Sequence, residues 1–255
     1  MAIRRARVSA SMISMPPAQP ELELTRAMGT DQTANSAASI VEAARLVISR
    51  EASAVAGLAE QIGEDFALLV ERILDTPGKV VTTGTGTSGI MAERLAHLLA
   101  VSGTPAFYLP CLDALHGGMG AISATDLVIA LSKGGQSSEL TQLTTRLAER
   151  SIHVVAVTEA PDSPFADAAG TVVVIATNPA EADLGGLIAT GSTLVAGAWG
   201  DALAATLMAS RNYSWENVIS THPGGIVGRQ TRLPDRPGLD NDQLGGTADP
   251  SNGPS

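Results

Sequence analysis

Hydrophobic residues along the middle of the chain follow two spacings in turn. From residue 37 to residue 75 they recur at helical spacing, interrupted at Gly63, which predicts two helices. Five short runs rich in apolar and β-branched residues predict strands at residues 79–83, 105–109, 126–131, 152–157 and 171–175. Helical patterns at residues 91–101, 139–150, 165–169, 190–210 and 215–219 predict further helices.

Strands that alternate with helices are typical of an α/β fold. Several of the strands are apolar throughout, as expected in a parallel sheet that is covered on both faces. We therefore predict one three-layer domain over residues 37–229, built on a five-stranded parallel sheet. The leader, residues 1–36, lacks the apolar run of a signal peptide, and the tail, residues 230–255, is rich in Pro, Gly, Asp and Asn. We expect both ends to be disordered.

Charge, cysteine content and the length of apolar runs limit the partners and the location expected for this protein. The formal net charge of −10, with no basic stripe in the central region, disfavours binding to nucleic acid. Cys111 is the single cysteine, so the chain has no internal disulfide and no metal-binding spacing, which suits a cytoplasmic protein. No stretch reaches the roughly 18 uninterrupted apolar residues of a membrane helix. We expect no membrane and no nucleic-acid partner.

The segment G-T-G-T-S-G at residues 84–89 follows a predicted strand and opens a predicted helix. Backbone N–H groups at such a helix N-terminus hold anions. The same letters satisfy the G-x-G-x-x-G pattern of dinucleotide-binding domains, and Asp113 lies at about the separation expected for a ribose-binding acid, so an NAD-binding enzyme is an alternative. The hydroxyls of Thr87 and Ser88 instead suit the direct binding of a terminal phosphate.

A second hydroxyl-rich loop separates the strand at 126–131 from the helix at 139–150. It contains Ser132, Lys133, Gln136 and Ser137. In an open α/β sheet, ligands bind beyond the carboxyl ends of the strands near a topological switch point, where both loops are expected to project. Together they predict one phosphate pocket. The alternative is that these hydroxyls only cap helix N-termini, where Ser and Thr are favoured.

Four motifs occur in the order seen in arabinose-5-phosphate isomerases of the SIS (sugar isomerase) family. They are G-T-G-T-S-G at 84–89, A-L-H-G at 114–117, S-K-G-G-Q-S-S-E at 132–139 and S-T-H-P-G-G-I-V-G-R at 220–229. The last motif is the most specific, and it differs only in its leading pair. The chain resembles this family over about residues 37–229. The resemblance implies a five-stranded parallel sheet, a homotetramer, and interconversion of an aldose phosphate and a ketose phosphate through an enediol, with no metal or redox cofactor.

The chain also departs from the family pattern. Thr87 replaces the lysine of the family's first loop, Gln136 replaces the glutamate of the second, and Lys133 stands at an asparagine position. The first two changes each remove a charge, so the family mechanism does not carry over intact. A non-catalytic sensor that keeps the sugar-phosphate pocket is therefore a second alternative. Typical relatives continue into CBS domains, whereas this chain ends in a polar tail, so regulation through such domains is not expected.

The resemblance also implies roles for three titratable residues. His116 and His222 match family pocket positions, and histidine titrates near neutral pH, which suits proton movement during ring opening. Glu181 matches the acidic position of the family's K-E-A-C-P segment. Isomerisation needs a group that accepts a carbon-bound proton, and Gln136 cannot do so. Glu181 is therefore the predicted base, assisted by His222 and His116.

Overall fold

The computed structural model describes residues 36–234. The predictions of a disordered leader and tail lie almost entirely outside these residues. Helix α2 (Ala37–Leu58) begins the described chain, and residues from Ile48 onward belong to one compact unit. The described part of the preceding unit is the first half of α2.

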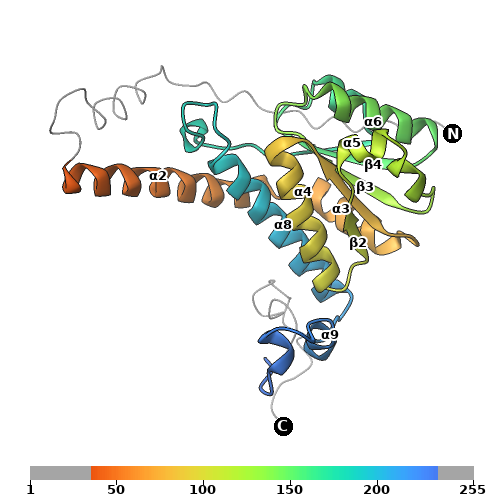
Figure 1. The fold of residues 1–255 in the computed structure, drawn as a ribbon. Helices are drawn as coiled ribbons and strands as arrows, with labels where there is room; N and C mark the ends of the chain where they lie inside the picture. The colour runs from red at the N-terminus through yellow and green to blue at the C-terminus, as the bar shows by residue number, and fades with distance from the viewer. Residues whose placement is uncertain (1–35, 235–255) are drawn as a thin grey trace, which may run out of the picture. The chain divides into compact units, whose positions relative to one another are not determined.

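A five-stranded, all-parallel sheet lies at the centre of the compact unit (Figure 1). Its strands are β1 (Val80–Gly84), β2 (Ala106–Tyr108), β3 (Leu127–Leu131), β4 (His153–Thr158) and β5 (Thr171–Val174), arranged in the order β2-β1-β3-β4-β5. Each predicted strand is confirmed, to within one residue at either end. Strand β2 pairs with one edge of β1, and the next strand, β3, pairs with the other edge. The strand order therefore reverses between β1 and β3.

Helices cover both faces of the sheet, which confirms the three-layer architecture. The α-helices are α3 (Glu64–Asp75), α4 (Gly86–Val101), α5 (Cys111–Leu115), α6 (Ser138–Glu149), α7 (Pro164–Ala168), α8 (Gly191–Ser210) and α9 (Trp215–Ser220). Short 3-10 turns are η2 (Ala59–Gln61), η3 (Gly118–Ala121), η4 (Ala180–Ala182) and η5 (Val227–Arg229). Helix α5 was not predicted from the sequence.

Two apolar clusters join these layers. On one face, α3, α4, α8 and the end of α2 pack on the sheet, and Trp199 is fully buried with its ring 6.4 Å from that of Phe66. On the other face, residues of α5, α6 and α7, including the fully buried Phe165, form the second cluster. Figure 1 shows α5 and α6 on this side of the sheet. Both clusters consist mostly of Val, Leu, Ile and Ala, so burial of aliphatic surface is the main source of stability.

The first glycine loop brings the N-terminus of α4 close to the end of β1. A Cβ on Gly84 would lie 2.9 Å from the Ser88 carbonyl oxygen, and one on Gly89 would lie 2.9 Å from the Tyr108 hydroxyl. Gly86 has a φ of +55°, a conformation that side chains with a Cβ rarely adopt. The three glycines therefore allow the helix to begin directly against the strand.

Asp126 fixes the amino ends of β1 and β3 to each other. Its buried carboxylate accepts hydrogen bonds from the Lys79 N–H (2.7 Å), the Ser123 N–H (2.7 Å) and the Ser123 hydroxyl (2.8 Å). Burial alone would raise the pKa of Asp126, but these hydrogen bonds and the nearby Lys79 ammonium outweigh it and lower the pKa.

Candidate functional site

A pocket opens at the carboxyl edge of the sheet, beside the reversal of strand order between β1 and β3. Its polar lining comes from the first turn of α4 (Thr87 and Ser88), the residues after β3 (Ser132 and Lys133), the end of β4 and the residue after it (Thr158 and Glu159) and the first turn of α8 (Ser192 and Thr193). This is where an open α/β sheet binds its ligands. A pocket therefore lies where the sequence predicted the site.

The two predicted loops meet beside this pocket. The Thr85 hydroxyl donates a hydrogen bond of 3.2 Å to the Ser137 hydroxyl. Ser137 is also the N-cap of α6, since its hydroxyl accepts a 3.4 Å hydrogen bond from the Leu140 N–H. Capping thus explains Ser137 in part, as the alternative interpretation anticipated.

Capping does not explain the other hydroxyls. Those of Thr87, Ser88 and Ser132 line the pocket and have no hydrogen-bond partner within residues 36–234. Thr87 and Ser88 belong to the first turn of α4, whose backbone N–H groups and helix dipole attract negative charge. This end of the pocket can therefore hold an anion through both backbone and side-chain donors.

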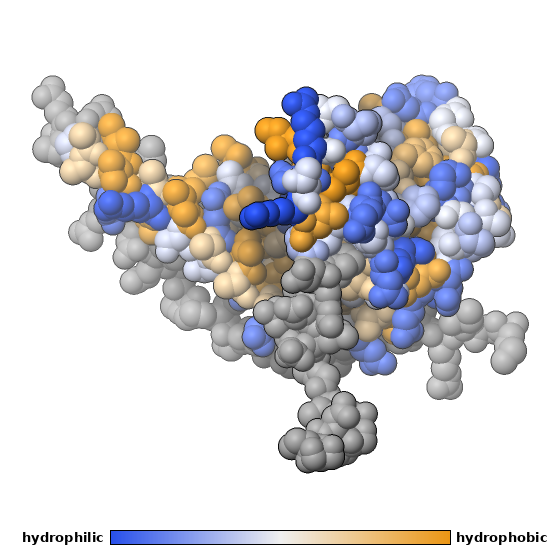
Figure 2. All heavy atoms as spheres, turned by 90° about the horizontal axis from the view of Figure 1, so that it is seen from below, coloured by the Kyte–Doolittle hydropathy of each residue, from blue (hydrophilic) through white to orange (hydrophobic). Residues whose placement is uncertain are grey.

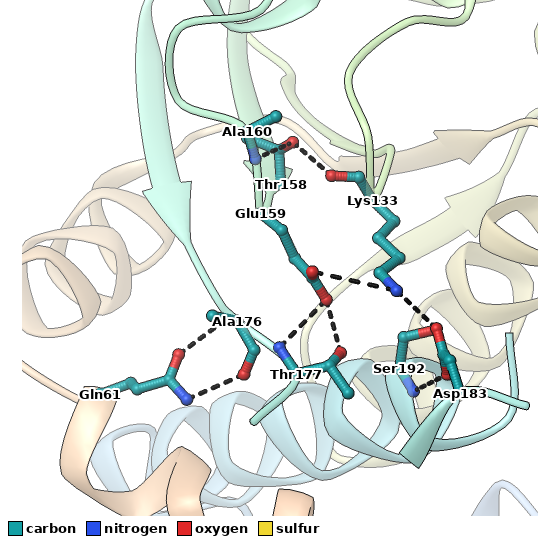
Figure 3. Close-up of polar contacts among 9 residues, drawn as sticks. All are labelled: Gln61, Lys133, Thr158, Glu159, Ala160, Ala176, Thr177, Asp183 and Ser192. Carbon is teal, nitrogen blue, oxygen red and sulfur yellow. Dashed lines mark hydrogen bonds and ion pairs between the residues drawn. The ribbon is translucent and has the colours of Figure 1, made fainter. Parts of the chain in front are cut away.

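Lys133, Glu159 and Asp183 form a charged cluster at the pocket, in which Lys133 and Glu159 belong to the lining (Figure 3). The Lys133 Nζ lies 2.5 Å from Asp183 Oδ2 and 3.9 Å from Glu159 Oε2. The Asp183 side chain is only 3% exposed, whereas those of Lys133 and Glu159 are 39% and 25% exposed. With one cation and two carboxylates, the charged cluster has a formal charge of −1.

The buried carboxylate of Asp183 anchors the charged cluster to α8. Its Oδ1 accepts a 2.8 Å hydrogen bond from the Ser192 N–H, in the first turn of that helix. Burial alone would raise the pKa of Asp183, but the hydrogen bonds from Lys133 and Ser192 and the Lys133 charge outweigh it and lower the pKa. Asp183 is therefore a carboxylate that holds the Lys133 ammonium in place.

Glu159 is oriented by the segment that follows β5. Its Oε1 accepts hydrogen bonds from the Thr177 N–H (3.1 Å) and the Thr177 hydroxyl (2.5 Å). That segment is itself fixed by Gln61, whose amide exchanges two hydrogen bonds with the backbone of Ala176 (Figure 3). The Glu159 side chain is thus held on one oxygen while the other, Oε2, faces Lys133.

The predicted binding residues differ in how near they lie to the pocket. Thr87, Ser88, Ser132 and Lys133 line it. Ser137 lies in the adjoining loop and contacts Thr85 there. Gln136, in the same loop, is exposed and is outside the pocket lining.

The three predicted catalytic residues lie outside the pocket lining of a single chain. Glu181 is exposed on η4. His116 is exposed at the end of α5, which follows β2. His222 follows α9, and its Nδ1 lies 2.6 Å from the Val218 carbonyl oxygen. Helix α8 separates α9 from the pocket, and its 20 residues extend about 30 Å.

The sequence interpretation missed Glu159, Asp183 and Ser192. Glu159 directly follows β4, so the rule that located the loops after β1 and β3 also applies to it. No glycine-rich segment marks that position, however. Asp183 and Ser192 gave no local signal, because their role depends on contact with Lys133, which is 50 residues from Asp183 in the sequence.

The described residues lack two further kinds of feature. Within residues 36–234, no group of three or more His, Cys, Asp or Glu side chains is arranged to hold a metal ion. None of the described helices combines the length and apolar character needed to cross a membrane.

The fold and the pocket define an α/β domain with hydroxyls and a helix N-terminus gathered at the switch point of a parallel sheet. Residues 57–205 match the model of the SIS domain family, and the chain belongs to that family. This match supports the sugar-phosphate interpretation of the glycine loop over the dinucleotide alternative.

Similarity to individual proteins supports this family assignment. The chain is 37% identical over 193 residues to arabinose 5-phosphate isomerase KdsD of Pseudomonas aeruginosa, covering 76% of this chain and 59% of the relative. It therefore spans about three fifths of the length of that relative. A putative sugar-phosphate isomerase from Listeria monocytogenes has a TM-score of 0.70 and 33% identity, covering 77% of this chain and all of that one. An Escherichia coli CFT073 protein in complex with arabinose 5-phosphate has a TM-score of 0.71 and 28% identity, covering 74% of this chain and 100% of that one.

Proposed function

We propose that the chain is an aldose–ketose isomerase for a small sugar phosphate of the arabinose 5-phosphate/ribulose 5-phosphate type. The observation that carries the proposal is the pocket, where the free hydroxyls of Thr87, Ser88 and Ser132 adjoin the N-terminus of α4. We place the phosphate between Ser88, Ser132 and Ser137. The isomerase names of the relatives and the arabinose 5-phosphate bound to one structural neighbour support this class of substrate.

The proposed reaction moves only protons within the substrate. An aldose phosphate loses a proton from the carbon next to its carbonyl, forms an enediol, and regains a proton on the neighbouring carbon. The number of electrons in the substrate is unchanged, so the conversion has no need of an oxidant or a reductant. It does need a base, a group that stabilises the developing oxyanion, and a firmly held phosphate.

A non-catalytic sugar-phosphate sensor is the second candidate. The observation that favours it is the absence of two charges that the resemblance leads one to expect, since Thr87 and Gln136 stand at the family's lysine and glutamate positions. A sensor would retain the anion-binding end of the pocket and would bind the same ligands.

One experiment separates these candidates. The pure protein is incubated with tetrose to heptose phosphates in deuterated water, and NMR follows exchange at the carbon next to the carbonyl. An isomerase exchanges at least one of them, whereas a sensor binds without exchange, as calorimetry would detect. Tight binding of NAD in place of any sugar phosphate would contradict both candidates.

We also propose a homotetramer, as the resemblance implies. Figure 2 displays apolar side chains on one face of the molecule, and large exposed apolar residues include Leu187, Ile188, Leu194 and Ile226. Surfaces of this kind commonly mark interfaces. His222 lies beyond the far end of α8 from the pocket, so it would reach a pocket only in a neighbouring copy. A monomer in sedimentation at micromolar concentration would overturn this assembly.

The proposed location is the cytoplasm. Cys111 is buried and free, and burial raises the pKa of its thiol to about 11, which keeps the thiol protonated and unreactive. A protein without disulfides is suited to a reducing compartment.

A further inference from the structure

We infer that Glu159 is the base that moves the carbon-bound proton in this pocket, and that Lys133 stabilises the oxyanion formed beside it. The inference rests on the proposed isomerase function. Neither of the residues that the family pattern suggests can serve as this base. Gln136 cannot accept a proton, and Glu181 is exposed outside the pocket lining. Glu159 is a carboxylate within that lining.

The pairing of β3 with β4 sets Lys133 and Glu159 side by side. Leu131 is the register partner of Val157 in the sheet. The ladder continues past both strands, because the Ser132 N–H donates to the Val157 carbonyl and the Glu159 N–H donates to the Lys133 carbonyl, each at 3.0 Å. Side chains alternate along such a ladder, so Lys133 and Glu159 lie on the same face as Leu131 and Val157, the face covered by α8.

The hydrogen bonds of Glu159 leave one oxygen for a substrate. Thr177 donates two hydrogen bonds to Oε1, and Oε2 accepts none within residues 36–234. Oε2 lies 3.9 Å from the Lys133 ammonium, which is too far for a direct hydrogen bond (Figure 3). A held carboxylate with a free oxygen in the pocket has the geometry that a general base requires.

Lys133 is placed to act on the same reacting atoms. Asp183 holds its ammonium from the side of α8. An ammonium has three N–H donors, so this contact leaves others for a substrate oxygen. Asp183 is here a positioning residue, because it acts on the substrate only through Lys133.

The charges also orient the substrate. The charged cluster carries a formal −1 and would repel a phosphate dianion, whereas the first turn of α4 attracts one. The phosphate therefore lies against the hydroxyls and the N-terminus of α4, and the carbonyl end of the open-chain sugar lies against Glu159 and Lys133.

The proton steps balance within the substrate. Glu159 takes the proton from C2 of the aldose, the C–H electron pair forms the C1–C2 double bond, and the carbonyl π pair moves to O1. Lys133 donates a proton to O1 and recovers one from O2, whose electrons re-form a carbonyl at C2. Glu159 then returns its proton to C1. The ketose has the formula of the aldose, and both side chains end in their starting states.

The test is Glu159→Gln, assayed by solvent deuterium exchange with the sugar phosphate that the wild-type protein turns over. The amide still accepts hydrogen bonds from Thr177 but cannot take a proton, so exchange should fall by about 100-fold or more, while calorimetric affinity for the sugar phosphate stays within about threefold. Glu149→Gln is the matched control. It makes the same change at an exposed carboxylate at the end of α6 and should leave exchange unchanged.

Four further variants keep the result decisive. Glu159→Ala should recover part of its exchange when formate is added, which loss of folding would not permit. Lys133→Met should lower kcat, and Asp183→Asn should lower kcat with little change in KM. The assignment of Glu159 would be overturned if Glu159→Gln exchanged within threefold of wild type. It would also be overturned if solvent exchange were lost in Glu181→Gln alone. A wild type that binds but never exchanges would instead overturn the proposed function, and the base assignment with it.

Discussion

The side-chain hydroxyls of Thr87, Ser88 and Ser132 are polar groups at the pocket without a partner in the described chain. Thr87 is exposed, whereas Ser88 is half-buried and Ser132 is buried. A hydroxyl that gives up water without gaining a partner costs free energy, so groups such as the latter two are usually paired unless a ligand supplies the partner. Ser132 is the most buried of the three, with 8% of its surface exposed. It is therefore the residue at which a lost ligand contact should be clearest.

Ser132→Ala should weaken sugar-phosphate binding about tenfold or more. A hydrogen bond to a charged group contributes about 1.5 to 3 kcal/mol, and about 1.4 kcal/mol corresponds to a tenfold change in Kd. Isothermal titration calorimetry measures the effect. Ser210→Ala, the same change at an exposed position at the end of α8, serves as the control. Equal affinities for the two variants would place the phosphate elsewhere.

At the level of secondary-structure elements, the position of the pocket depends on the relative placement of β1 and β3. Asp126 connects the amino ends of these strands through the Lys79 and Ser123 N–H groups. Removing its carboxylate breaks both of these part-buried hydrogen bonds, and a hydrogen bond to a charged group contributes about 1.5 to 3 kcal/mol. Asp126 should thus stabilise the fold from the edge opposite the pocket.

Asp126→Ala should lower the free energy of unfolding by about 2 to 4 kcal/mol at pH 7. Because the pKa of Asp126 is lowered in the folded state, its stabilisation is present above the unfolded pKa of about 3.9 and is lost as the pH falls through the folded pKa. Urea denaturation at pH 7 and below pH 4 should therefore show the difference from wild type shrinking in acid. Asp162→Ala, at an exposed turn, is the control. If the difference in unfolding free energy between Asp126→Ala and wild type stayed constant with pH, it would contradict the electrostatic explanation.

The sequence predicted the elements better than it predicted the site. The five strands are short runs rich in apolar and β-branched residues, so the sequence pattern located them closely. The loops after β1 and β3 were recognised because glycines and hydroxyls mark them. Glu159 follows β4 without such a mark, and its importance depends on Thr177 and Lys133, which come from other segments. Contacts of this kind are set by the register and layering of the fold, which local patterns do not contain.

At the scale of the whole molecule, α8 separates two regions that the proposed function needs to bring together. Its first turn lines the pocket through Ser192, and α9 with the segment containing His222 follows its other end. If His222 assists catalysis, it does so in the pocket of another copy. Assembly would then be part of the active site, as well as a source of stability.

Mixing two impaired variants tests this arrangement. His222→Ala and Ser132→Ala should each have lowered activity at low substrate concentration, whereas co-expressed chains should form mixed tetramers in which about a quarter of the pockets combine native Ser132 with native His222. Solvent exchange should rise accordingly above that of either parent. Activity of the mixture equal to the mean of the two parents would show that both residues act within one chain, or that His222 has no catalytic role.

The charged cluster of Lys133, Glu159 and Asp183 also constrains how this pocket can evolve. Loss of Lys133 alone would leave two carboxylates facing each other, one of them buried, and loss of Asp183 alone would leave the lysine ammonium without its anchor. Replacement that begins at Lys133 or Asp183 therefore passes through an intermediate with an unpaired charge. Descendants of this chain should keep or exchange Lys133 and Asp183 together, although the two positions lie 50 residues apart in the sequence.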